Sequence, residues 1–118
     1  MKKYCIRKCI PISHSNDDVR EHAHTHTVEV SIYTRLKDTP NEISEIQRLE
    51  KLIEACLAPY YECYLNDKPG FENDTSIERL GDMIFYDIDE AFKNIAIDME
   101  KLEIGETPLR TYILTKVV

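Results

Sequence analysis

Two stretches of alternating apolar and polar residues open the sequence. The first covers residues 4–14 and the second covers residues 22–36, with a short polar loop between them. Alternation with a period of two is typical of a strand that buries one face, and so short a loop favours an antiparallel hairpin. The residues expected to share one face of this hairpin are Tyr4, Ile6, Ile10, Ile12, His14, His22, His24, His26, Val28, Val30 and Ile32.

Two helical patterns follow the hairpin. Apolar residues recur at three- and four-residue spacing over residues 46–57 and stop before Pro59, and a second stripe covers residues 77–95. A capping-box pattern over residues 75–78 marks the start of the second helix. Two further strands fit residues 102–106 and 109–117. The sequence therefore predicts one α+β domain over residues 1–118, with the order β-β-α-α-β-β.

A four-stranded antiparallel sheet with both helices on one face is the expected architecture. Such a sheet leaves its two edge strands unpaired and one face uncovered. A chain this short also buries a limited core by itself. We therefore expect a homo-oligomer in which neighbouring subunits cover these edges.

The charge of the chain excludes two classes of partner. Twenty-two acidic residues against 15 basic ones give a net charge of −7. Nucleic acids and anionic membranes attract positive surfaces, so we expect the protein to bind neither. No apolar run approaches the ~18 residues that a membrane span needs, and no signal peptide is recognisable. The expected location is the cytoplasm, where the four cysteines would stay reduced.

All four histidines lie between positions 14 and 26. Residues i and i+2 of a strand project to the same side, so His22 and His24 are expected to be neighbours. The hairpin would bring His14 opposite them. Three imidazoles that leave one open position are typical of a catalytic zinc site, so we expect His14, His22 and His24 to bind Zn²⁺. His26 would line the pocket; the alternative is a histidine-rich surface loop without metal.

Five segments of the sequence form a recognisable set. They are Ile-Pro-Ile-Ser-His at 10–14, His-Ala-His followed by Val-Glu-Val within 22–30, Tyr-Leu-Asn-Asp at 64–67, Thr-Ser-Ile-Glu-Arg-Leu at 75–80 and Leu-Glu-Ile-Gly-Glu-Thr at 102–107. In this order they resemble the 6-pyruvoyltetrahydropterin synthase and 6-carboxytetrahydropterin synthase family. The resemblance covers nearly the whole chain.

The resemblance implies a tunnelling fold, in which subunits join their sheets into a barrel as a trimer or a hexamer of two trimers. It implies a zinc-dependent carbon–oxygen lyase that eliminates triphosphate from dihydroneopterin triphosphate or a related pterin, in queuosine or other 7-deazaguanine biosynthesis. The active sites would lie between subunits.

Glu106 corresponds to the glutamate that anchors the pterin ring in this family. Because Glu106 continues the alternation of Leu102 and Ile104, we expect it to point to the covered face, where a carboxylate needs a partner. A salt bridge to Arg110 is one alternative. A pterin or guanine edge, which offers two parallel N–H donors, is the other.

The sequence departs from the family at the groups that transfer protons. Asp18 stands where the family has a cysteine, and Tyr61 and Glu62 stand where it has an Asp-His pair. A carboxylate desolvated in a pocket can act as a general base, so Glu62 and Glu21 are the candidate catalytic residues. Two alternatives remain: a non-catalytic homologue that binds a pterin or purine, and a structural oligomer with an adventitious metal.

Overall fold

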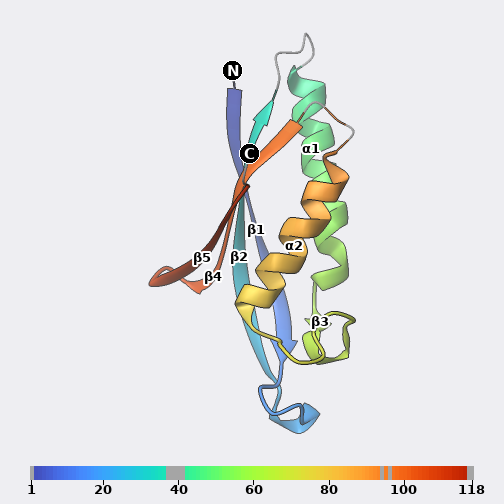
Figure 1. The fold of residues 1–118 in the computed structure, drawn as a ribbon, viewed down its shortest axis with the longest axis vertical. Helices are drawn as coiled ribbons and strands as arrows, with labels where there is room; N and C mark the ends of the chain where they lie inside the picture. Colours follow the sequence, from blue (N-terminus) through green and yellow to red (C-terminus); the bar gives the residue numbers. More distant parts are fainter. Residues whose placement is uncertain (1, 37–41, 94, 96, 117–118) are drawn as a thin grey trace.

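A twisted five-stranded sheet forms the centre of the structure, and two helices cover one of its faces (Figure 1). The structure is a computed structural model that describes residues 2–36, 42–93, 95 and 97–116, without the side chains of residues 42–44. The strand order is β3-β1-β2-β4-β5. Strands β1 (Lys2–His14) and β2 (His24–Leu36) form a long antiparallel hairpin, in which His14 is opposite His24.

The remaining strands extend the hairpin on both sides. Strand β4 (Ile97–Thr107) pairs antiparallel with β2, and β5 (Arg110–Thr115) pairs antiparallel with β4. On the other side, the two-residue strand β3 (Cys63–Tyr64) runs parallel to β1. The sheet therefore has short edge strands at both sides, β3 and β5.

The helices α1 (Glu42–Leu57) and α2 (Ile77–Ala91) form the second layer (Figure 1). Their apolar sides pack on the sheet because the stripes found in the sequence face inward. Neither described helix is long and apolar enough to cross a membrane. The fully buried side chains of this core include Ile12, Val28, Val30 and Ile32 from the hairpin, Leu49 and Ile53 from α1, Leu80, Ile84 and Ile88 from α2, and Leu102 and Ile104 from β4.

Ser76 caps the start of α2. Its hydroxyl oxygen accepts a hydrogen bond of 3.1 Å from the backbone N–H of Arg79. The capping-box pattern over residues 75–78 placed the helix start one residue too early, because the N-cap is Ser76 and not Thr75. Thr75 instead contributes its backbone carbonyl to the site described below.

The predicted fold class and order of the main elements are confirmed. The predicted four-stranded sheet is wrong in one detail, because β3 is the fifth strand. Two residues are too few to produce an alternating pattern, so the sequence indicated only a connector there. Three short 3₁₀ helices were also missed: η1 (Arg20–His22), η2 (Ala58–Tyr60) and η3 (Leu65–Asp67). The last predicted strand ends at Thr115 in the structure, and residue 117 lies outside the described residues.

Candidate metal centre

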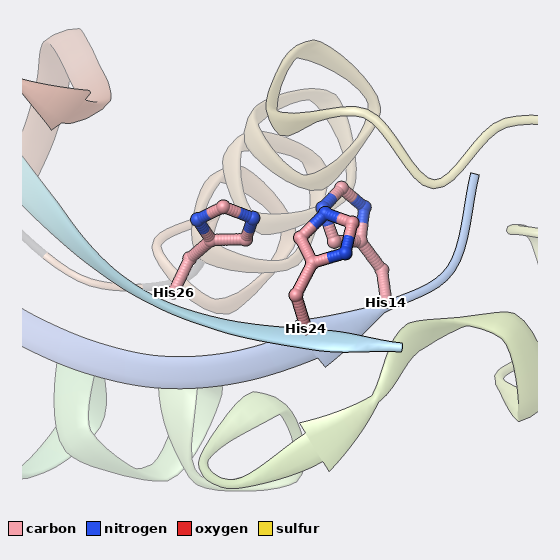
Figure 2. A group of neighbouring side chains, drawn as sticks. All are labelled: His14, His24 and His26. Atoms are coloured by element: carbon pink, nitrogen blue, oxygen red, sulfur yellow. The ribbon is translucent and has the colours of Figure 1, made fainter. Parts of the chain in front are cut away.

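Three imidazole rings meet where the hairpin ends. We call His14, His24 and His26 the histidine cluster (Figure 2). One ligand nitrogen from each ring lies within 4.8 Å of the other two. His14 is the last residue of β1, His24 is its partner at the start of β2, and His26 follows two positions later on the same face. Backbone pairing and strand periodicity together therefore bring the three rings together.

Each ring of the histidine cluster contacts a hydrogen-bond acceptor through Nδ1. The acceptors are the Thr75 carbonyl oxygen at 2.8 Å from His14, the His22 carbonyl oxygen at 3.4 Å from His24 and a Glu106 carboxylate oxygen at 3.0 Å from His26. Carbonyl oxygens accept, so Nδ1 must carry the proton in the contacts of His14 and His24. His26 and Glu106 form an ion-pair contact. This assignment leaves Nε2 of His14 and His24 with the lone pair that a metal ion needs.

His14 is the most buried ring of the histidine cluster, with 7% of its surface exposed. Burial lowers the pKa of its imidazole, and the hydrogen bond to the Thr75 carbonyl partly opposes that shift. The neutral form of His14 is therefore favoured at neutral pH. A neutral imidazole is the form that binds a metal ion.

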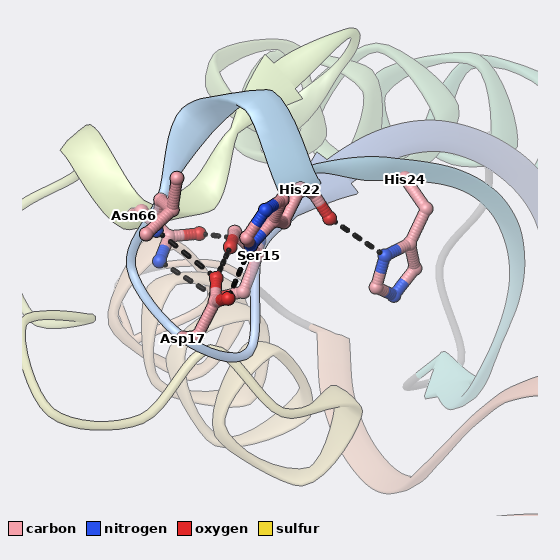
Figure 3. Close-up of polar contacts among 6 residues, drawn as sticks. Ser15, Asp17, His22, His24 and Asn66 are labelled. Carbon is pink, nitrogen blue, oxygen red and sulfur yellow. Dashed lines mark hydrogen bonds and ion pairs between the residues drawn. The ribbon is translucent and has the colours of Figure 1, made fainter.

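His22, which the sequence predicted as a metal ligand, is not a member of the histidine cluster. It lies in η1 before β2 begins, and its Nδ1 contacts a carboxylate oxygen of Asp17 (Figure 3). The predicted strand start at His22 is therefore wrong by two residues. The polar loop turns through η1, so His26 occupies the third position near His14.

Asp17 organises the loop that carries His22. Its carboxylate contacts His22 and accepts a hydrogen bond of 2.6 Å from the Ser15 hydroxyl (Figure 3). It also accepts a hydrogen bond of 3.1 Å from the Val19 backbone N–H. These contacts, the Ser15 hydroxyl first, hold the pKa of Asp17 well below its usual range. Asp17 thus remains ionised, and its partner His22 lies outside the histidine cluster.

Asn66 connects this loop to the rest of the site. Its side-chain oxygen accepts from the Ser15 backbone N–H at 2.9 Å, and its side-chain nitrogen donates to the Ser15 carbonyl and to Asp18, each at 2.9 Å. Ser15 directly follows His14 and is 1% exposed. Asn66, from the Tyr-Leu-Asn-Asp segment, therefore satisfies buried backbone groups next to the first cluster histidine.

The two candidate catalytic carboxylates lie outside the group of clustered ligands found among the described residues. Glu21 is an exposed residue of η1. Glu62 is also exposed; it has a positive φ of 56° and donates its backbone N–H to the Pro11 carbonyl at 2.7 Å. A non-glycine residue with this φ is uncommon, and here it directly precedes the parallel strand β3.

Glu106 lies beside the histidine cluster. The sequence predicted a carboxylate on the covered face, paired with Arg110 or with a ring edge. Glu106 is instead an exposed residue, and one of its carboxylate oxygens lies 3.0 Å from Nδ1 of His26. Glu106 also lines two hollows, of about 350 Å³ and about 310 Å³. Residues at the start of α2, Ile77 and Glu78, share the second hollow with Tyr112 of β5. An open hollow therefore lies next to Glu106, which itself contacts His26 of the histidine cluster.

The comparisons with solved structures agree with this architecture. The fold is similar to the 6-pyruvoyl tetrahydropterin synthase of Caenorhabditis elegans, with a TM-score of 0.77 and 15% identity over 98% of this chain and 96% of that one. The corresponding synthase of Plasmodium falciparum has a TM-score of 0.67 and 14% identity over 99% of this chain and 98% of that one.

Two structures of the Plasmodium vivax synthase, each 12% identical with a TM-score of 0.64 over 99% of this chain and 98% of that one, carry a replaced glutamate that is described as a catalytic residue. The sequence has no significant match among the curated proteins. It matches the family described as 6-pyruvoyl tetrahydropterin synthase over residues 1–116. Because this match covers nearly the whole sequence, the chain belongs to the 6-pyruvoyl tetrahydropterin synthase family and has its tunnelling fold.

Proposed function

We propose that this protein is a zinc-dependent carbon–oxygen lyase that acts on a pterin with a phosphorylated side chain, such as dihydroneopterin triphosphate. The observation that carries the proposal is the histidine cluster, in which all three Nδ1 atoms contact acceptors. A histidine-rich surface loop without a metal would not need contacts that orient three rings toward one point. Family membership supports a pterin as the substrate class.

The proposed zinc ligands are His14, His24 and His26. The sequence pattern favoured His22 in place of His26, but the contact of His22 with Asp17 argues for the set that is already close together. Three nitrogen ligands with an open fourth position fit zinc in a catalytic site. Bound zinc would act there as a Lewis acid toward the oxygens of the substrate side chain.

The proposed role of Glu106 in substrate binding is to anchor the ring edge. A pterin presents two parallel N–H donors, and a carboxylate binds such an edge through two oxygens. Glu106 lines the hollow of about 310 Å³, which is close to the size of a small-ligand pocket. Rings without the donor edge would leave this carboxylate poorly paired and would bind more weakly.

We propose a glutamate as the group that transfers the proton, because this sequence lacks the cysteine and the Asp-His pair of the family. Glu21 and Glu62 are the two candidates named by their positions in the sequence. The P. vivax synthase has a glutamate that is described as a catalytic residue, which supports a carboxylate as the group that transfers the proton. The carboxylate would remove a proton from the substrate side chain while the triphosphate leaves.

The proposed functional unit is a trimer or hexamer. Strand β5 is an edge strand, in which Ile113 is 51% exposed, and Leu109 in the turn before it is 94% exposed. Pairing of this edge with a neighbouring subunit would cover these side chains and the backbone groups of the strand. Sedimentation at micromolar concentration checks this assembly, and a stable monomer would contradict it.

A second candidate function is binding of a pterin or purine without turnover. It is favoured by the exposure of Glu21 and Glu62 and by their absence from the clustered ligands of the described residues. The deciding experiment incubates untagged, zinc-loaded protein with dihydroneopterin triphosphate and follows release of triphosphate. Turnover that chelation abolishes supports the lyase. Tight binding without turnover supports the second function, and protein that contains no metal as purified contradicts the zinc proposal.

A further inference from the structure

Glu106 and His26 come from opposite ends of the sequence and meet in the structure. A carboxylate oxygen of Glu106 lies 3.0 Å from Nδ1 of His26, and the two side chains are 32% and 27% exposed. His14 and His24 contact backbone carbonyls instead. Among the described residues, His26 is therefore the only member of the histidine cluster whose Nδ1 contacts a side chain and not a backbone carbonyl.

A bulge in β4 accompanies this placement of Glu106. Ile104 pairs with Tyr112 and Thr107 pairs with Arg110, so β4 has two residues, Gly105 and Glu106, where β5 has one. An extra residue bends the strand and redirects the side chains beside it. A Cβ on Gly105 would lie 2.9 Å from the Arg110 carbonyl oxygen, so the close approach of the two backbones at the bulge requires glycine.

We infer that Glu106 is a positioning residue of the histidine cluster, which holds the His26 ring with Nε2 directed at the metal position. This inference rests on the proposed zinc function and adds a role for Glu106 that is separate from binding the substrate ring. A carboxylate that accepts from Nδ1–H fixes the tautomer and orientation of the imidazole and makes its Nε2 a stronger ligand. Loss of such a partner typically lowers metal affinity by roughly 10–100-fold.

The inference is tested without substrate, by competition with a chromophoric zinc chelator at fixed pH. We expect Glu106→Ala to bind zinc roughly 10–100-fold more weakly than the wild type. Glu106→Gln should lose less, because its amide oxygen can still accept from Nδ1–H. The matched control is Glu103→Ala, since Glu103 lies on the same strand but contacts Tyr33. This control should bind zinc as the wild type does.

Two spectroscopic measurements separate positioning from general loss of structure. The visible spectrum of the Co²⁺ form reports ligand geometry, and it should change in Glu106→Ala but not in Glu103→Ala. In the metal-free protein at a pH of about 8.5, where an ordinary histidine is neutral, ¹⁵N spectra should show His26 protonated at Nδ1. Glu106→Ala should mix the two tautomers.

The outcomes distinguish this inference from the proposed function. Unchanged zinc affinity and unchanged spectra in Glu106→Ala would overturn the positioning role while leaving zinc binding intact. A wild-type protein that binds no zinc, but whose His26 tautomer depends on Glu106, would overturn the zinc function and support the contact. A His26 tautomer that does not respond to Glu106→Ala would overturn the inference whatever the metal content.

Discussion

Nδ1 of His14 lies 2.8 Å from the carbonyl oxygen of Thr75, a residue 61 positions later in the chain. Thr75 directly precedes Ser76, the N-cap of α2. The end of the first strand and the start of the second helix are thus fixed to each other at the histidine cluster. The position of one proposed metal ligand therefore depends on how α2 begins.

Replacement of the cap tests this dependence. Ser76→Ala removes the acceptor for the Arg79 N–H, and we expect the free energy of unfolding to fall by about 1 kcal/mol, which urea denaturation measures. Zinc affinity should fall as well, because the Thr75 carbonyl loses its fixed position. Ser76→Thr keeps a hydroxyl cap and is the matched control. Equal zinc affinity in the alanine and threonine variants would show that the cap does not act on His14.

The identity of the third histidine is tested by a pair of single substitutions. His26→Ala should lower zinc affinity by more than the roughly 10–100-fold expected for loss of an orienting partner, because a ligand itself is removed. His22→Ala should retain zinc, since His22 contacts Asp17 outside the cluster. Elemental analysis and chelator competition on untagged protein measure both variants. Loss of zinc from His22→Ala with retention in His26→Ala would restore the ligand set that the sequence pattern favoured.

The sequence could predict the elements of this fold because their periodicity is strong. It could not predict which histidines cluster, because His22, His24 and His26 have the same parity on a strand. Their roles depend on where the strand begins, and that point is set by the turn through η1 and by the contact between Asp17 and His22. These are loop interactions that leave no periodic signal.

The contact of Glu106 with His26 could not be predicted from the sequence for a similar reason. Alternation with Leu102 and Ile104 predicted that Glu106 faces the covered side. In the structure Glu106 is an exposed residue whose carboxylate contacts His26. The bulge at Gly105 changes the register with β5, and a one-residue change in register has no signature in composition. The glycine itself was the available signal, since an isolated glycine in a strand often marks a bulge.

The proposed proton-transfer residues are tested by Glu21→Gln and Glu62→Gln. Glutamine keeps the size and polarity of the side chain but removes the group that accepts the proton. If either glutamate is the general base, its variant should lose ~10²–10⁴ in turnover while zinc content and pterin affinity are unchanged. Steady-state release of triphosphate measures the rate. Full activity in both variants would contradict the carboxylate proposal and direct attention to other residues.

A buried tyrosine gives the fold a predictable response to high pH. Tyr60 donates a hydrogen bond of 2.6 Å to Asp87 of α2 and is 3% exposed. Burial, and then the bond to Asp87, raises the pKa of Tyr60 well above its usual range. The folded state therefore favours the neutral phenol. This stabilisation is fully present below the ordinary tyrosine pKa of about 10 and is lost as the pH rises above it.

We expect Tyr60→Phe to lower the free energy of unfolding by about 1.5–3 kcal/mol at neutral pH, because a hydrogen bond to a charged acceptor is lost. The decline of stability above pH about 10 should also become shallower. Urea unfolding at several pH values measures both effects. Tyr86→Phe is the control, because Tyr86 is 62% exposed and lies on α2, the helix that carries Asp87. A pH dependence that is identical in the wild type and Tyr60→Phe would contradict the raised pKa.

Asn66 is expected to stabilise both the fold and the histidine cluster. Asn66→Ala would leave the N–H and carbonyl of Ser15 without their side-chain partner, although Ser15 is only 1% exposed. A buried polar group without a partner costs about 1–3 kcal/mol, so the free energy of unfolding should fall by at least that amount. Asn73→Ala is the matched control, since Asn73 is an exposed amide at the same surface hollow. Because Ser15 follows His14 directly, zinc affinity should fall in Asn66→Ala and not in Asn73→Ala. A large loss of stability with unchanged zinc affinity would show that the loop contact supports the fold without positioning His14.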